Sequence, residues 1–178
     1  MIDSLLRRSQ AGVTAVELMI VLAIGAILAA ATMPFFGATI ERYRAVGVAN
    51  DLLRSFSLAR AQALATGDRA VVAPLADGNW RSGWRIFLDP NNNGVFDAGD
   101  TALQVFPAMP DEMAAAGSAG FAVDGGQFLS FNAMGQPRAL NGTTFTDARL
   151  QITLGATVRA VCIDARGRSS VVHSTNCP

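Results

Sequence analysis

The sequence contains no lysine, one histidine and only two cysteines, and these shortages narrow the functions open to it. Arginine supplies all 14 basic side chains, which balance 14 acidic ones, so no overall field recruits nucleic acid or anionic lipid. His173, which we expect to be exposed, has no obvious catalytic partner, and Ser169 and Ser170 lie in a strand-like run. A glycine-rich phosphate loop and a cysteine–histidine zinc pattern are also absent. The sequence therefore argues against an enzyme.

Charge is also missing from a long stretch near the N-terminus. From Leu18 to Phe36 no residue is charged. A helix of this length, rising about 1.5 Å per residue, can cross a bilayer core of roughly 30 Å. Glu17 stands at the start of the stretch, where a carboxylate is costly unless a cation meets it. A cut after Gly12 would create an amino group on Val13 one helical turn away, in the same molecule or in a neighbour. This arrangement is typical of a helical polymer.

These residues resemble the class III signal of type IV pilins and type II secretion pseudopilins. The resemblance rests on a short basic leader with Arg7 and Arg8, on Gly12 as its last residue, and on Glu17 as the fifth residue after it. It implies that a prepilin peptidase cuts after Gly12, that the new N-terminus at Val13 is methylated, and that the helix stays attached.

Two other interpretations of this segment stay open. An ordinary secretory signal has an apolar part of only about 7 to 15 residues without an acid, followed by a small-x-small cleavage site that residues 29–31 could imitate. A plain single-pass anchor would leave Glu17 incidental.

The chain is expected to form an α+β fold in four segments. These are a leader (1–12), a transmembrane and assembly half of a long helix (13–40), a soluble half of the same helix (41–66) and a β-rich globular domain (67–178). Pro34 should kink the helix or loosen a turn. One face of the soluble half carries apolar residues at helical spacing, namely Val48, Leu52, Phe56 and Ala59 or Ala63. Gly67 is the expected left-handed cap.

After the helix, the spacing of apolar residues changes to every second position. Short runs rich in Val, Ile, Phe and Thr alternate with turn residues, at 69–74, 84–89, 101–107, 126–132, 149–154, 156–164 and 169–174. They predict six or seven antiparallel strands that clasp the helix. Residues 109–120 are interpreted as a loop with at most one helical turn.

The domain also resembles the GspH/FimT subfamily of minor pilins and pseudopilins. The resemblance rests on the blocks LARAQALATGDRAVV, NWRSGWRIFLDPNNNG, LSFNAMGQP and CIDARGRSSVV. It implies a pilin-like fold in which a long helix is followed by two β-sheets. Trp80 and Trp84, inside the second block, are expected to pack in the core, with stacking on a nucleic-acid base as the minor alternative.

The two cysteines, Cys162 and Cys177, both lie near the C-terminus. Positive charge on the leader side places the domain across the membrane from the cytoplasm, in an oxidising compartment. The spacing leaves room for a strand, a turn and a return, so we predict a bridge rather than two buried thiols. Closing a loop of about 15 residues should contribute on the order of 3 kcal/mol.

The segment 89–100 carries oxygen-bearing residues at the spacing of a calcium loop. Positions 1, 3, 5, 9 and 12 are side chains and position 7 is a carbonyl, supplied by Asp89, Asn91, Asn93, Asp97, Asp100 and Val95 respectively. This donor set suits Ca²⁺, the one cofactor that the sequence suggests. The preceding run is strand-like, so a full EF-hand is not expected. The alternative is a hairpin turn whose side chains cap their own backbone.

The C-terminal part is locally basic, with five arginines from Arg138 onward against two aspartates. Arg166 and Arg168 flank Gly167 in the predicted turn before the last strand. The arrangement is similar to the C-terminal Gly-Arg-x-Arg element through which FimT-type pilins are thought to bind DNA, although the second arginine of that element is missing. Two or three phosphate contacts would give weak, salt-sensitive binding. The alternative is a solvated turn.

The prediction is a minor pilin or pseudopilin that assembles into a type IV pilus, with the tip as its candidate position. Its expected partners are other pilins, the assembly machinery, the prepilin peptidase and the inner membrane, with the C-terminal domain in the periplasm. Two alternatives stay open: the H-type minor pseudopilin of type II secretion, and, from a different class, a DNA receptor for natural transformation.

Overall fold

The computed structural model describes residues 12–76, 78–117, 128–139 and 147–177, without the side chains of 32–36. The leader residues 1–11 therefore lie outside the described part. The chain forms two compact units, Met1–Gly37 and Ala38–Pro178. Helix α1 (Ala15–Thr66) continues from the first unit into the second, and the helical assignment runs across Pro34. The predicted kink at this proline stays a prediction.

In the first unit, α1 exposes apolar side chains around its circumference. Val16, Leu18, Met19 and Ile20 are each more than half exposed. Residues 18–36 are predicted to cross a membrane. Among the described residues, no helix combines the length and the hydropathy that crossing a membrane requires.

In the second unit, one face of α1 forms the centre of the hydrophobic core. Its fully buried residues follow helical spacing and are mostly small: Ala45, Ala49, Leu52, Phe56, Ala59 and Ala63. The alanines allow the strands to approach the helix closely, while Phe56 fills the space beside Trp80 in an edge-to-face contact at 6.3 Å. The predicted helix face is confirmed. The helix ends where predicted, because Gly67 has a φ of 77° and its N–H donates to the Ala63 carbonyl.

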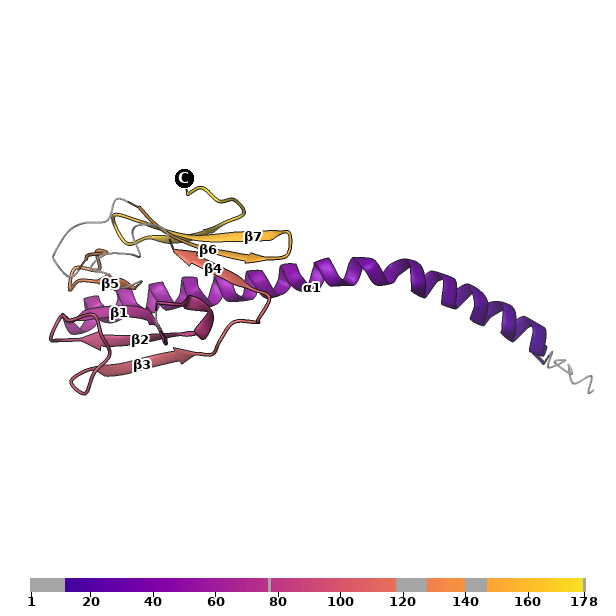
Figure 1. Ribbon diagram of the computed structural model, residues 1–178, viewed down its shortest axis with the longest axis horizontal. Coiled ribbons are helices and arrows are strands. Elements are labelled where there is room, and N and C mark those ends of the chain that lie inside the picture. The colour runs from indigo at the N-terminus through magenta and orange to yellow at the C-terminus, as the bar shows by residue number, and fades with distance from the viewer. Residues whose placement is uncertain (1–11, 77, 118–127, 140–146, 178) are drawn as a thin grey trace, which may run out of the picture. The chain divides into compact units, whose positions relative to one another are not determined.

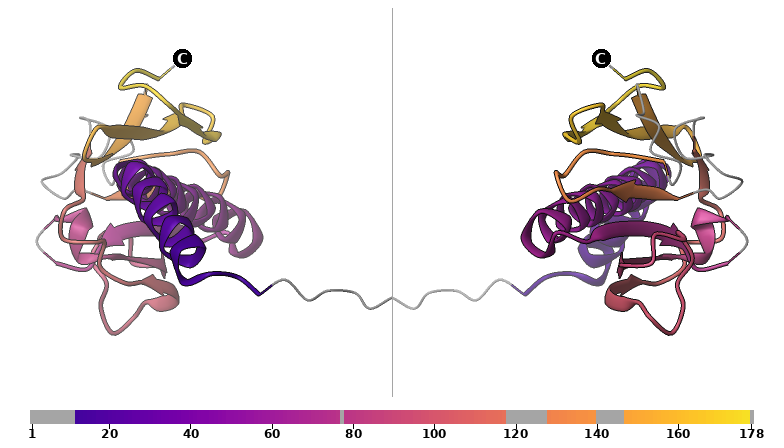
Figure 2. Two further views of the ribbon diagram at one scale, coloured as in Figure 1. Left: turned by 90° about the vertical axis from the view of Figure 1, so that its right-hand side faces the viewer. Right: turned by 90° about the vertical axis from the view of Figure 1, so that its left-hand side faces the viewer.

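Two four-stranded antiparallel sheets share this core with the helix (Figures 1 and 2). The first has the order β3-β2-β1-β5, with β1 at Arg69–Pro74, β2 at Trp84–Asp89, β3 at Thr101–Phe106 and β5 at Leu129–Phe131. The second has the order β4-β6-β7-β8, with β4 at Ala114–Gly117, β6 at Asp147–Leu154, β7 at Thr157–Asp164 and β8 at Ser169–Val172. In Figure 1, β2 and β3 lie on one side of the helix, and β6 and β7 lie on the other.

One local prediction was wrong. Residues 114–117, interpreted as part of a loop, form β4, because pairing with β6 recruits an alanine-rich segment that has little strand propensity of its own. Trp80 lies before the predicted strand 84–89, in a 3-10 helix, η1 (Trp80–Ser82), which the Asn79 side chain caps. Both tryptophans are nevertheless buried, so the predicted core role is confirmed.

Trp84 links the first sheet to the helix. Its Nε1–H donates to Ser55 Oγ at 2.8 Å, and Ser55 in turn donates to the Asp51 carbonyl of α1. Its indole also stacks on Phe106 of β3 at 4.8 Å. The polar end of this tryptophan is therefore satisfied inside the core, which fixes β2 and β3 against α1.

Candidate functional site

The predicted processing site lies immediately before α1. Gly12 and Val13 are outside the helix and exposed, with Val13 73% accessible. Thr14 is the N-cap: its hydroxyl accepts from the Glu17 N–H at 3.2 Å, and its own N–H points to the Glu17 carboxylate at 3.4 Å. This reciprocal pair is a capping box, with Glu17 at the third helical position near the positive end of the helix dipole.

The capping box adds a role for Glu17 that the sequence analysis missed. Thr14-x-x-Glu17 is a local signal for a helix start and could have been found from spacing alone. The observed geometry brings the carboxylate next to the backbone of residue 14. An amino group created on Val13 would therefore lie one residue from the group that already contacts Glu17.

A disulfide ties the C-terminal tail to the second sheet. Cys162 of β7 and Cys177 are bonded, with their Cα atoms 5.7 Å apart, so the predicted bridge is confirmed. The intervening residues form a turn, strand β8 and the returning tail. Arg149 of β6 donates to the Thr175 carbonyl, which holds the same tail a second time. His173, on this tail, is exposed as expected.

The loop 89–100, which has the residue spacing of a calcium loop, is held together by hydrogen bonds among its own residues. Asp89 is fully buried, and its carboxylate accepts from the N–H groups of Asn93 and Gly94 at 3.1 and 2.8 Å. Asp97 accepts from the Gly99 N–H and from the amides of Asn91 and Asn93. These bonds lower the pKa of Asp97, the Gly99 N–H most of all.

The same loop covers the first sheet. Phe96 packs edge-to-face on Phe87 of β2 at 5.4 Å, and the Arg85 guanidinium lies 4.0 Å from the centre of its ring. Across the described residues, no three Asp, Glu, His or Cys side chains gather in a way that could hold a metal. Ca²⁺ binding through Asp89, Asp97, Asp100 and their neighbours stays a prediction.

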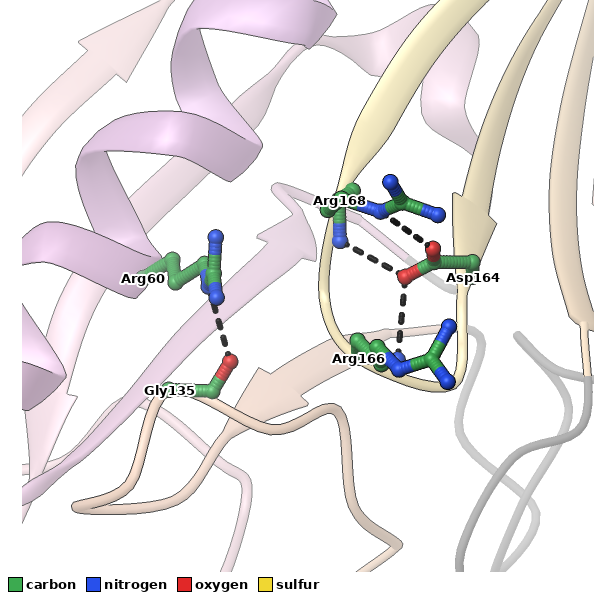
Figure 3. A network of polar contacts seen from close by, with 5 residues as sticks. All are labelled: Arg60, Gly135, Asp164, Arg166 and Arg168. Atoms are coloured by element: carbon green, nitrogen blue, oxygen red, sulfur yellow. Dashed lines mark hydrogen bonds and ion pairs between the residues drawn. The ribbon is translucent and has the colours of Figure 1, made fainter.

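Residues 165–168, called the arginine turn because they include Arg166 and Arg168, connect β7 and β8. The carboxylate of Asp164 organises this turn (Figure 3). Asp164 Oδ1 accepts from the N–H groups of Arg166 and Arg168, both at 2.9 Å, and Oδ2 pairs with Arg168 Nε at 2.7 Å. The Arg168 N–H is the largest cause of a lowered pKa for Asp164. Both arginines are exposed as predicted, but Arg168 has its charge compensated inside the turn.

A groove of about 350 Å³ lies between this turn and the C-terminal part of α1. Arg60 enters it from the helix, with its Nε–H donating to the Gly135 carbonyl at 3.0 Å (Figure 3). Ser57 and Ser169 face each other across the groove at 3.4 Å. Sequence reasoning missed Arg60, because no local signal connects it to a turn more than 100 residues further along the chain. Arg159, one of the five arginines of the C-terminal part, is buried.

Comparison with known families now identifies the chain. The family model described as "Type II transport protein GspH" matches residues 48–167, which is more than half of the sequence. The chain belongs to the GspH family. A second model, the "Prokaryotic N-terminal methylation motif", matches residues 7–33 of this GspH-family protein. The comparison with curated proteins found no match.

Solved structures share the fold. The type IV minor pilin FimU of Pseudomonas aeruginosa matches with a TM-score of 0.56 and 20% identity, over 80% of this chain and 96% of FimU. The minor pseudopilin EpsH of the Vibrio cholerae type 2 secretion system matches with a TM-score of 0.52 and 13% identity, over 75% of this chain and 99% of EpsH. This GspH-family protein is accordingly a minor pilin or pseudopilin, and its family and structural neighbours are fibre components rather than enzymes.

Proposed function

We propose that this protein is made as a precursor, cut after Gly12 and methylated on Val13, and then incorporated into a type IV pilus. The observation that carries the proposal is the exposed Gly12–Val13 segment directly before a helix whose first turn holds Glu17. A peptidase can reach an exposed segment outside the helix, whereas a helical one would first have to unwind. The apolar helix that follows would anchor the precursor in the inner membrane, with the domain in the periplasm.

The disulfide supports the periplasmic placement, because such bonds persist in oxidising compartments. Partners in this proposal are the prepilin peptidase, the assembly machinery and other pilins. A position near the fibre tip would need only a few copies per fibre.

The test of this proposal is mass spectrometry of the protein extracted from membranes. A chain that starts at a methylated Val13 is expected. An intact Met1, or a cut after Ala31, would contradict the proposal. A Gly12→Val variant is the matched control and should accumulate uncut, because a branched side chain replaces hydrogen at the cleavage position.

Type II secretion is the alternative within the same family. The likeness to FimU and EpsH reflects a shared fold, so it does not decide between a pilus and a pseudopilus. Deleting the gene separates the two: loss of surface fibres with normal protein secretion favours the pilus, and the reverse favours the pseudopilus.

DNA reception is a second candidate, favoured by the groove beside the arginine turn. Arg60 and Arg168 border it together with two serine hydroxyls, which suits a phosphate group. Binding should be independent of DNA sequence and should weaken steeply with salt. Changing Arg166 and Arg168 to Ala should reduce it, and Arg60→Ala should reduce it further. No binding by the wild-type protein at low salt would remove this candidate.

A further inference from the structure

The part of α1 that follows the uncharged run carries large exposed side chains. Tyr43 is 73% exposed and Ile40 is 49% exposed. Tyr43 is also the single tyrosine of the chain. Arg42 and Arg44 stand on either side of it and are exposed as well. Residues 40–44 therefore present an aromatic ring, an aliphatic side chain and two positive charges outside the core of the second unit.

Helical geometry separates these groups from the one acid in the segment. Successive residues of an α-helix are turned by about 100°, so Glu41 and Ala45 share one face, and Ile40 and Tyr43 share the opposite one. Ala45 is fully buried, and a Cβ added to Gly155 in the β6–β7 turn would lie 3.0 Å from the Glu41 carboxyl carbon. Figure 1 shows this turn alongside the helix. The acid is thus directed to its own domain, while the tyrosine faces away from it.

The two arginines flank the tyrosine and are not neutralised within the described part of the chain. Among the described residues, neither Arg42 nor Arg44 forms an ion pair. The adjoining β6–β7 turn, at Gly155 and Ala156, is exposed and uncharged, so it supplies no acid either. A guanidinium matches the oxygens of a phosphate group through parallel hydrogen bonds. The outward side of residues 40–44 is therefore complementary to a phosphate-bearing, partly apolar surface.

The position of the segment along the helix matches the headgroup layer of a bilayer. A helix over residues 18–36 rises about 28 Å, close to a hydrocarbon core of about 30 Å. From residue 36 to Tyr43 a helix rises about a further 10 Å, and its side chains lean toward the N-terminus, back toward that core. The headgroup layer is about 5–8 Å thick on each side, within reach of these side chains. Tyrosine is enriched at this level because its ring is apolar and its hydroxyl is polar.

We propose that residues 40–44 bind phospholipid headgroups on the periplasmic side of the inner membrane. Tyr43 and Ile40 lie at the boundary with the acyl chains, and Arg42 and Arg44 bind the phosphodiester groups beside them. This contact sets the depth of the precursor in the membrane and is released when the helix leaves for the fibre. The inference rests on the proposed function, since the preceding part of α1 must be in the membrane.

The test uses full-length protein in vesicles of phosphatidylethanolamine and phosphatidylglycerol, with bromine on the acyl carbons nearest the headgroups as a fluorescence quencher. Trp80 and Trp84 are buried in the core, so the wild type gives the background signal. The added fluorescence of Tyr43→Trp should fall at least about twofold, and less when bromine is placed at the bilayer centre. Leu64→Trp is the matched control, because Leu64 is 53% exposed on the same helix, about 30 Å further along. Its fluorescence should not change.

The contribution of the arginines is measured in the Tyr43→Trp protein. Replacing Arg42 and Arg44 together by Gln should weaken the quenching, because the phosphate contacts are lost. Arg54→Gln is the control: this arginine is on the same helix, its side chain is 77% exposed, and it pairs with Asp51. It should leave the quenching unchanged. Equal quenching in all three proteins would remove the arginines from the proposed contact.

The outcomes separate this inference from the proposed function. If the protein floats with the vesicles but Tyr43→Trp is quenched no more than the wild type, the inference is overturned and the membrane anchor stands. Stronger quenching from the bilayer centre would also overturn it, because the segment would lie among the acyl chains. Protection of position 43 only in assembled fibres would assign this surface to a neighbouring subunit instead. If the wild type does not float with the vesicles, the anchor is missing and the proposed function fails.

Discussion

Gly83, which precedes β2 of the first sheet, has a backbone conformation that residues with a Cβ rarely adopt. Its φ is 91°, and a Cβ at this position would lie 2.8 Å from the carbonyl carbon of Pro107, after β3. Gly83→Ala therefore combines backbone strain with a clash and should lower the free energy of unfolding by about 2–4 kcal/mol. Urea unfolding of the full-length protein in detergent measures this loss.

Gly47→Ala is the matched control for that substitution. Gly47 lies inside α1, and an added Cβ would meet nothing within 4 Å. The free energy of unfolding of the variant should rise by about 0.5–1 kcal/mol, because alanine loses less chain entropy than glycine when a helix forms. Equal changes in the free energy of unfolding for the two substitutions would show that neither the clash nor the positive φ at Gly83 determines the loss of stability.

At the level of elements, predictions based on local pattern succeeded and those that depend on distant pairing did not. The buried face of α1, the cap at Gly67 and most strands follow from hydrophobic period and turn chemistry. Strand β4 could not be predicted, because alanines form a strand there only by pairing with β6. With it, the described part of the chain holds eight strands instead of six or seven.

The same distinction between local pattern and distant contacts applies to the candidate sites. The Cys162–Cys177 bridge and the exposed arginine turn were predictable from spacing. The burial of Arg159 and the approach of Arg60 to Gly135 depend on how sheet and helix meet. No window of sequence contains that information, because the residues in each contact are far apart along the chain.

The β7–β8 turn should lose stability in acid. The Asp164 carboxylate accepts two N–H groups and pairs with Arg168, so its pKa in the folded state is lower than the unfolded value of about 3.9. A depressed pKa contributes stability that is present above the unfolded value and disappears as the pH falls through the folded value. The difference in stability between wild type and Asp164→Asn should be constant from about pH 5 to 7 and shrink below about pH 4. A difference that persists undiminished to about pH 2 would contradict this assignment.

The disulfide should stabilise the second sheet mainly through the unfolded chain. It links residues 15 apart, for which chain entropy predicts about 3 kcal/mol. Cys162→Ala combined with Cys177→Ala should therefore lower the free energy of unfolding by roughly this amount. A reducing agent should lower the free energy of unfolding of the wild type and leave that of the double variant unchanged. If reductant also destabilises the double variant, its effect does not come from this bond.

The whole molecule joins two parts that match different family models. The N-terminal motif that matches the methylation model ends at residue 33, close to the boundary of the first compact unit at Gly37, and the GspH match lies entirely in the second. The same helix runs through both units. In the proposed function, a signal in the first unit directs processing and assembly, and the second unit carries the surface that distinguishes this subunit from others. Glu17 is the residue at which these two tasks can be separated by experiment.

Glu17→Gln and Glu17→Ala together distinguish a helix cap from a charge needed for assembly. Glutamine at the third helical position can still accept the Thr14 N–H, so it keeps the capping box but removes the charge, whereas alanine removes both. If the carboxylate pairs with the amino group of Val13 in a neighbour, both variants should be processed and reach the membrane normally, yet both should be depleted from sheared fibres. Normal incorporation of Glu17→Gln with loss of Glu17→Ala would mean that the cap alone matters. Normal incorporation of both would make the carboxylate incidental and remove the electrostatic basis for its role in assembly.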